Sequence, residues 1–274
     1  FRSRAKMETN NQKKIIGVAV YELLGTSLMM YAMMLFKGDY GVATGLSATL
    51  MFLAWDVSGG HFNPAITLGM FMADLKNAGK NLVIMLIMIV AQFAGAFLGI
   101  FWGWLAIVNK LWQDKIDSDY SVPSGAVGEI GPTLPGNAGI DHGDDPDNGF
   151  TRDWQTFFAM FLTSMILVLA YASVKMPQTA ISDNKVVQII ALTFIFTGLN
   201  GCNMKFGEAG INPALASGYI AFVASQHTDD EAYNHYLWAY MIGPLFGGAL
   251  GGFLYLIHSR CAQTKGRDNS FTEI

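Results

Sequence analysis

Asn63-Pro64-Ala65 and Asn212-Pro213-Ala214 are two copies of one three-residue string, and each lies between long apolar segments. Asn is a favoured helix N-cap, and Pro is tolerated at the first helical position because the N–H that it lacks would have no partner there. Each string therefore predicts the start of a helix. A helix that begins inside a membrane presents free backbone donors and a partial positive charge of about half a unit at its tip. Two such tips facing each other predict a pore site that attracts oxygen lone pairs and disfavours cations.

The composition is that of an integral membrane protein. The 274 residues are 52% apolar and 14% charged, which is far more apolar than a soluble domain of this length. Six charge-poor runs could each cross about 30 Å of hydrocarbon, so we expect an all-α membrane protein with six transmembrane helices and two re-entrant half-helices. No small-residue cleavage site follows the first run, so we expect no signal peptide. The predicted spans are 14–36, 41–57, 82–108, 154–174, 186–204 and 236–258.

The positions of the basic residues predict the orientation, because such residues are retained on the cytoplasmic side. With the N-terminus inside, twelve of the 17 Lys and Arg residues fall in cytoplasmic segments and five in outer segments. We therefore expect cytoplasmic tails at 1–13 and 259–274 and one channel domain at 14–258, in the plasma membrane or an intracellular vesicle membrane. The net charge of -4 comes mostly from outer loops, so no nucleic-acid partner is expected.

The two halves of the chain form a repeat. The strings lie 149 residues apart, one after the second predicted span and one after the fifth. Three spans in each half invert the second copy relative to the first, so the two half-helices enter from opposite sides. Thr26-Ser27 and Thr163-Ser164 occupy matching places in the first and fourth spans. We place repeat 1 at about 14–108 and repeat 2 at about 154–258.

The segment 109–153 joins the halves as a long outer loop, rich in Gly, Pro and Asp and without clear periodicity. Four of its aspartates do not match the spacing of a calcium loop, so a solvated acidic loop is preferred over a cation site. We expect no metal and no cofactor. The four aspartates are Asp141, Asp144, Asp145 and Asp147.

Several motifs occur in a fixed order along the chain. They are Glu22 with Thr26, Ser58 to Ala65, Ala91-Gln92 with Gly95-Ala96, Gly210 to Ala214, and Gly243-Pro244 with Gly247-Gly248-Ala249. Together they resemble the aquaporin (major intrinsic protein) family, over about 15–258. The resemblance implies a six-helix right-handed bundle with two half-helices meeting at the midplane, one pore per protomer and a homotetramer. It also implies the lipid bilayer, water and small uncharged solutes as partners.

The resemblance assigns roles to the two strings. It makes Asn63 and Asn212 the central side-chain donors to a permeating oxygen, while Pro64-Ala65 and Pro213-Ala214 begin the half-helices. The alternative is that both asparagines are only N-caps. The two roles are compatible, because the capping oxygen and the donor nitrogen are different atoms. The backbone carbonyls that the resemblance places along the pore as acceptors include those of Gly60, His61, Ala209 and Gly210.

Glu22 is an ionisable side chain inside a predicted span, which by default suggests a functional group. The resemblance favours a structural role instead, as an acceptor for backbone N–H groups of a re-entrant loop. Such loops exist at membrane depth only where their polar groups are satisfied. The family usually has a matching Glu in the fourth span, whereas this chain has Ala159 there. The sequence therefore does not indicate which group holds the second loop, the one that precedes Asn212.

The predicted filter, at the narrowest point of the pore, departs from the family pattern. The family normally carries an Arg three residues after the second Asn, and this chain has Leu215. The other filter positions correspond to Asn200, Ala209 and either Ala43 or Thr44. This constriction lacks both the guanidinium and an aromatic clamp. We therefore expect it to be wider and less repellent to cations than a water-only filter, unless Leu215 or a loop plugs it.

Two further positions bear on the filter. Lys205 could reach the outer mouth and restore a positive charge, although a lysine that extends to the membrane interface is the preferred interpretation. Glycerol-conducting members usually place an Asp immediately after the Arg, and this chain has Ala216 there. The chain therefore fits neither common subtype cleanly.

These expectations favour a passive channel for water, with passage of small uncharged solutes such as glycerol, urea or hydrogen peroxide. The alternative is a structural or adhesion membrane protein with a closed pore. An enzyme is not expected, since no Ser–His or metal-ligand constellation recurs at helical spacing in the spans. Thr179 and Ser182, between Lys175 and Lys185, are candidate phosphorylation sites that could move this connection relative to the pore mouth. An exposed loop without a regulatory role is the preferred alternative.

Overall fold

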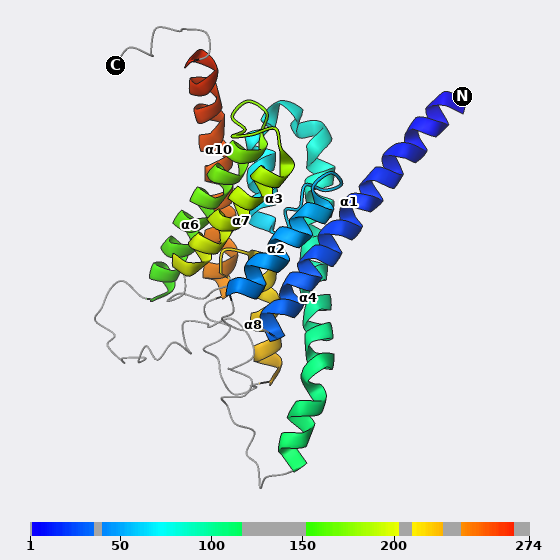
Figure 1. Ribbon diagram of the computed structural model, residues 1–274, viewed down its shortest axis with the longest axis vertical. Coiled ribbons are helices and arrows are strands. Elements are labelled where there is room, and N and C mark those ends of the chain that lie inside the picture. The colour runs from blue at the N-terminus through cyan, green and yellow to red at the C-terminus, as the bar shows by residue number, and fades with distance from the viewer. Residues whose placement is uncertain (1, 36–39, 117–151, 203–209, 227–236, 266–274) are drawn as a thin grey trace.

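The structure of the chain is a computed structural model that describes residues 2–35, 40–116, 152–202, 210–226 and 237–265 (Figure 1). All the secondary-structure elements among these residues are helices, joined by turns and loops. The α-helices are α1 (Arg2–Leu35), α2 (Tyr40–Ala54), α3 (Pro64–Ala73), α4 (Ala78–Ile116), α6 (Arg152–Lys175), α7 (Lys185–Cys202), α8 (Pro213–Gln226) and α10 (Leu237–Lys265). A 3-10 turn, η1 (Leu75–Asn77), joins α3 to α4.

Five helical segments of the described chain are long and apolar enough to cross a membrane. The remaining predicted span, 41–57, corresponds to α2, which has 15 residues and ends at Ala54. It ends before residue 57 because the N–H groups of Val57, Ser58 and Gly59 all donate to the Ala54 carbonyl, which closes the helix in a turn. The five segments are Lys14–Leu35, Asn81–Ala106, Trp154–Lys175, Lys185–Cys202 and Leu237–Ala262.

Three helices extend well beyond the predicted spans, and one of them, α10, continues to Lys265 inside the predicted tail at 259–274. The predicted tail at 1–13 is helical from Arg2 onwards, as the first turns of α1. Helix α4 continues to Ile116, inside the segment predicted as an outer loop, because residues 109–116 contain neither Gly nor Pro to end it. The rest of that loop up to residue 151, including Asp141, Asp144, Asp145 and Asp147, lies outside the described residues.

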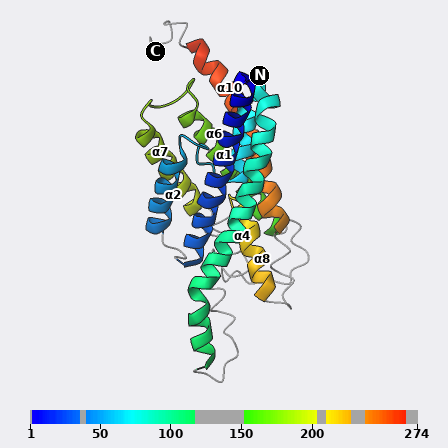
Figure 2. The same cartoon turned by 90° about the vertical axis from the view of Figure 1, so that its right-hand side faces the viewer.

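The inverted repeat is visible in the helix packing. Helix α1 packs against α4 in the first half, and α6 packs against α10 in the second (Figures 1 and 2). Both seams rest on glycines: a Cβ at Gly95 or Gly99 would collide with α1 carbonyls, and a Cβ at Gly247 or Gly251 would collide with α6 carbonyls. Close backbone approach of this kind is how helices associate where lipid offers no hydrophobic driving force. Thr26, Ser27, Thr163 and Ser164 are all buried inside the bundle.

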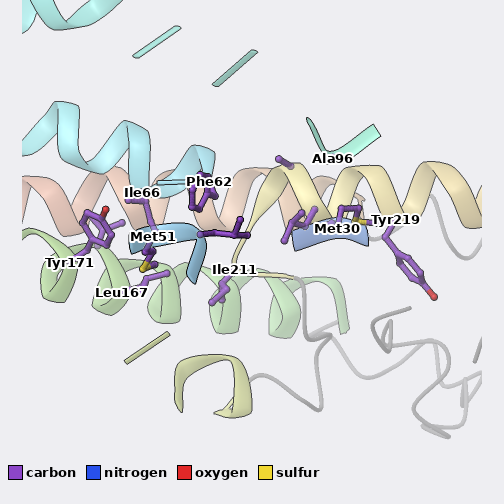
Figure 3. Packing of buried hydrophobic residues seen from close by; sticks show 14 of the residues in the cluster. Met30, Met51, Phe62, Ile66, Ala96, Leu167, Tyr171, Ile211 and Tyr219 are labelled. Carbon is purple, nitrogen blue, oxygen red and sulfur yellow. The ribbon is translucent and has the colours of Figure 1, made fainter. Parts of the chain in front are cut away.

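The two half-helices, α3 and α8, lie inside the bundle and meet near its centre. A core of apolar side chains surrounds their junction and extends from Tyr171 at one end of the view to Tyr219 at the other (Figure 3). Phe62 and Ile211, the residues that precede the two asparagines, belong to this core. Large apolar side chains such as Phe194 and Val90 face outwards instead, as expected for helices whose solvent is lipid.

Candidate functional site

Both three-residue strings begin a helix inside the bundle. Asn63 has extended backbone geometry (φ -149°, ψ 119°), and its Oδ1 accepts the Ala65 N–H at 2.8 Å, which caps α3. Asn212 caps α8 in the same way, with its Oδ1 accepting the Ala214 N–H at 3.1 Å. Pro follows each cap at the first helical position, as the sequence predicts. Capping uses only the oxygen of each carboxamide, so both nitrogens remain available for other hydrogen bonds.

The carboxamide nitrogens join the two half-helices tip to tip. Nδ2 of Asn63 donates to the Ile211 carbonyl at 2.9 Å, and Nδ2 of Asn212 donates to the Phe62 carbonyl at 2.8 Å. A carboxamide carries two N–H donors, so these bonds use one donor of each asparagine. Both side chains are almost completely buried. The site therefore presents two fixed amide donors at the point where two helix N-termini converge.

The first loop, residues 55–63 between α2 and α3, contains carbonyl oxygens that accept a hydrogen bond and others that do not. The Phe62 carbonyl binds Asn212, and the Gly59 carbonyl accepts both the Tyr171 hydroxyl and the Lys175 ammonium. Among the described residues, no protein group donates to the carbonyls of Gly60 or His61. Two consecutive acceptors without a protein donor therefore lie next to the asparagine donors.

Left-handed backbone geometry turns the first loop. Gly59 (φ +95°), Gly60 (φ +67°) and Phe62 (φ +49°) all have positive φ. Phe62 is the strained residue of the three, since left-handed backbone geometry destabilises a residue that has a Cβ by about 1–2 kcal/mol. Its ring packs against Gly25, where a Cβ would collide with it, so burial of the ring offsets the strain. The turn directs successive carbonyls in different directions.

Glu22 holds the first loop from α1. Its Oε2 accepts the Phe62 N–H at 2.7 Å and the Gln92 amide at 2.7 Å. Its Oε1 accepts the His61 N–H at 3.1 Å and the Ser58 hydroxyl at 2.6 Å. Four donors satisfy this fully buried carboxylate, which makes it a brace for the loop. At Ala159, on α6, there is no carboxylate to do the same for the second loop.

The structure describes only some of the predicted filter residues. Leu215 is 2% exposed and packs in the central core next to Ala216 and Tyr219. Thr44 bonds the Thr197 hydroxyl at 2.8 Å, which links α2 to α7. Asn200 is half-buried near the end of α7. The side chain of Ala43, together with all of Ala209 and Lys205, lies outside the described residues, while Gly210 is buried where the chain resumes.

The two candidate regulatory residues have different surroundings. Thr179 is held inside the junction of α6 and α10, where its hydroxyl bonds the Ser173 carbonyl at 3.0 Å and the Tyr255 hydroxyl at 3.1 Å. Ser182 lies just before α7, and its hydroxyl accepts the Asn184 N–H at 3.1 Å. A phosphate on Thr179 would break these bonds, whereas the Ser182 hydroxyl bonds only a neighbouring backbone N–H.

Sequence reasoning missed three residues of the site. Tyr171 and Lys175 reach the Gly59 carbonyl from α6, and Thr197 meets Thr44 from α7. The sequence did contain a signal for the first two, since residues at i and i+4 share one helix face. Nothing in the sequence indicated which face of α6 the first loop would contact.

The fold and the site define a class: a multi-pass helical membrane protein whose two half-helices meet tip to tip inside the bundle. The chain belongs to the Major intrinsic protein family, whose model matches residues 9–255. Its relatives are distant. Aquaporin PIP1-5 of Zea mays is 25% identical over 226 residues, which cover 82% of this chain and 66% of that protein. An aquaporin of Laccaria bicolor is 26% identical over 249 residues, which cover 87% of this chain and 83% of that protein.

The chain matches a smaller part of other relatives. Aquaporin-4 of Bos taurus is 26% identical over 216 residues, or 77% of this chain and 53% of that protein. Among solved structures, the X-ray structure of the aquaglyceroporin from Plasmodium falciparum has the same fold, with a TM-score of 0.68 over 91% of this chain and 99% of that one. The identity to that structure is 16%, so the likeness concerns the fold alone.

Proposed function

We propose that this protein is a passive transmembrane channel for water, with passage of small uncharged solutes such as glycerol, urea or hydrogen peroxide. The observation that carries the proposal is the pair of cross-bonded asparagines, each with one amide N–H beyond the bond to the opposite loop. The names of the curated relatives, which are aquaporins, and of the structural neighbour, an aquaglyceroporin, support the same class.

The geometry suits water. An oxygen between Asn63 and Asn212 accepts from both amides, so its own hydrogens point away from the centre. In the first half they meet the open carbonyls of Gly60 and His61. Water molecules on the two sides are then oriented in opposite directions, which breaks the hydrogen-bonded chain along which a proton would hop.

The solute range is the finer part of the proposal. Leu215 in place of an arginine removes a guanidinium and its donors from the filter, which favours wider solutes. We also infer a homotetramer with both termini in the cytoplasm. The first turns of α1 and the last turns of α10 do lie at one end of the bundle (Figure 1).

The test is osmotic. The purified protein in lipid vesicles is exposed to a step in impermeant osmolyte, then in glycerol, then in urea, and vesicle volume is followed by stopped-flow light scattering. We expect water flux well above that of empty vesicles, and glycerol flux above it as well. Water flux equal to that of empty vesicles would favour the alternative, a structural or adhesion protein with a closed pore.

A further inference from the structure

Lys175 is half-buried, and its ammonium group lies against one end of the first loop. It is the last residue of α6, and its Nζ donates to the Gly59 carbonyl at 2.7 Å. The same nitrogen lies 4.3 Å from the ring centroid of Trp55, a cation–π distance. Lysine side chains are mostly exposed, and those that are withdrawn from solvent usually have a counter-ion. The position of this lysine therefore needs an explanation.

No carboxylate forms a salt bridge with Lys175 in the described part of the chain. Asp56, which is near in sequence to Gly59, is paired with Lys185 at 2.8 Å. Glu22 lies behind the loop, where its two oxygens are used by four other donors. The contacts of the ammonium are thus the Gly59 carbonyl, the Tyr171 hydroxyl at 3.4 Å and the rings of Trp55 and Tyr171, all of which are uncharged.

The loop is shaped to receive this group. Gly59 has a φ of +95°, and a Cβ there would occupy the space that Nζ fills. The Tyr171 hydroxyl donates to the same carbonyl at 2.7 Å, and the His61 ring meets the Tyr171 ring edge to face at 5.6 Å. Lys175 and Tyr171 therefore converge on the Gly59 carbonyl, which lies four residues before Asn63, and the His61 ring packs beside Tyr171.

The location along the pore follows from the chain path. The connection from α6 to α7 lies at the same end of the bundle as the first turns of α1 and the last turns of α10 (Figure 1). The first loop leads from this end to the tip of α3. In the proposed channel, a permeant entering from this end would meet the loop that holds the ammonium before it met the asparagines.

We propose that Lys175 is a specificity-determining residue, whose ammonium group repels cations at this entrance and so supplies the fixed charge that Leu215 does not supply at the filter. The inference rests on the proposed channel function. A charge held at a narrow, partly dehydrated entrance raises the barrier for cations more than a charge in bulk water would. Neutral solutes are little affected, because their passage depends on hydrogen bonds.

A purely structural role predicts something different. A lysine that only fastened the loop could be replaced by any side chain that donates to the Gly59 carbonyl. Lys175→Gln keeps an N–H donor and removes the charge, whereas Lys175→Arg keeps both. Lys185→Gln is the matched control, since Lys185 also binds the first loop but at the exposed Asp56.

The experiment uses the full chain in vesicles and measures osmotic water flux together with sodium and potassium flux. We expect Lys175→Gln to raise cation flux about ten-fold or more, with water flux within a few-fold of wild type. Lys175→Arg and Lys185→Gln should exclude cations as the wild type does. Thermal unfolding in detergent checks that the variants are folded, and Lys175→Met serves as the neutral variant should the glutamine form be unstable.

The outcomes separate the inference from the proposed function. A wild type that conducts no water overturns the channel proposal itself. A wild type that conducts water while a folded neutral variant still excludes cations overturns only the role of Lys175. The role is also refuted if the wild type and Lys175→Gln pass cations equally.

Discussion

At the scale of single residues, each asparagine of the two strings uses its carboxamide in two directions. Oδ1 caps its own half-helix, and Nδ2 donates to the backbone of the opposite loop. One side chain therefore sets the start of a helix, the distance between the two tips and the direction of the remaining N–H. A substitution that keeps the capping oxygen and removes the amide N–H groups therefore tests the role of the donor separately.

Replacement of Asn63 or Asn212 by Asp is such a substitution. A carboxylate caps a helix well but offers no donor, so the opposite carbonyl and the permeant both lose a partner. We expect lower folding yield and water flux reduced by about ten-fold or more. The assay is vesicle swelling at equal reconstituted protein.

Asn184→Asp is the control for that pair. Asn184 caps α7 through its Oδ1, which accepts the Val186 N–H at 2.9 Å, and it lies outside the core of the bundle. Its replacement should leave water flux unchanged. If Asn63→Asp and Asn212→Asp both had the water flux and the yield of the wild type, the assignment of the two asparagines to the pore would be wrong.

The same residues show how far sequence reasoning reaches. The starts of α3 and α8 were predicted, because N-cap chemistry and proline placement depend only on neighbours in the chain. The convergence of Lys175 and Tyr171 on Gly59 was not predicted, since it depends on which face of α6 meets a loop more than a hundred residues away. The early end of α2 was missed for a different, local reason: a turn with positive φ at Gly59 and Gly60 follows it.

At the scale of elements, α10 is the surface on which the first half-helix rests. The backbone of α10 at Gly248 and Gly252 lies against the α3 carbonyls of Ala65 and Gly69. Any side chain there would push α3 away from the axis of the bundle. The position of the Asn63 tip is therefore fixed by glycines on a helix of the other repeat.

Gly248→Ala tests this contact. The new methyl group would collide with the Ala65 carbonyl, so α3 or α10 must shift, and we expect a loss of about 1–3 kcal/mol of stability together with reduced water flux. Gly198→Ala on α7 is the matched control, because a Cβ there meets nothing within 4 Å. The control should hold or raise the melting temperature, since alanine is the better helix former by about 0.5–1 kcal/mol. Equal melting temperatures and fluxes for the two variants would refute the contact.

The connection between α6 and α7 offers a regulatory hypothesis at the same scale. A phosphate on Ser182 would lie at the N-terminal end of α7, where its charge is favoured, and close to Lys185, which holds the first loop through Asp56. We expect Ser182→Glu to change water flux measurably relative to Ser182→Ala, with Thr179→Val as a variant that keeps the packing of the junction and removes only its hydroxyl bonds. Equal conduction by the alanine and glutamate forms would end the hypothesis.

At the scale of the whole molecule, the two ends of the proposed pore differ in charge. One end holds the Lys175 ammonium on the first loop. Towards the other end, Leu215 lies buried where the family normally carries an arginine. Barriers along one pathway act in series, so the highest barrier limits the flux of an ion wherever it lies. Exclusion of cations at either end would then be sufficient.

Leu215→Arg adds charge at the second end. The guanidinium both narrows the aperture and repels cations, while water can still hydrogen-bond past it. We expect glycerol flux to fall several-fold and water flux to stay within a few-fold of wild type, as measured by swelling in glycerol and in impermeant osmolyte. Unchanged or increased glycerol passage would mean that residue 215 does not face the pore.

Combining Leu215→Arg with Lys175→Gln tests whether the two positions share one pathway. If the ammonium and the guanidinium act as barriers in series, the added arginine should suppress the cation flux that the neutral glutamine permits, and bring it back to within a few-fold of wild type. The measurement is sodium and potassium flux in vesicles for both single variants and the double variant, normalised to water flux. A double variant that leaks cations as freely as Lys175→Gln alone would place residue 215 outside the path that cations take, and cation exclusion would then depend on the end of the bundle where α6 meets the first loop.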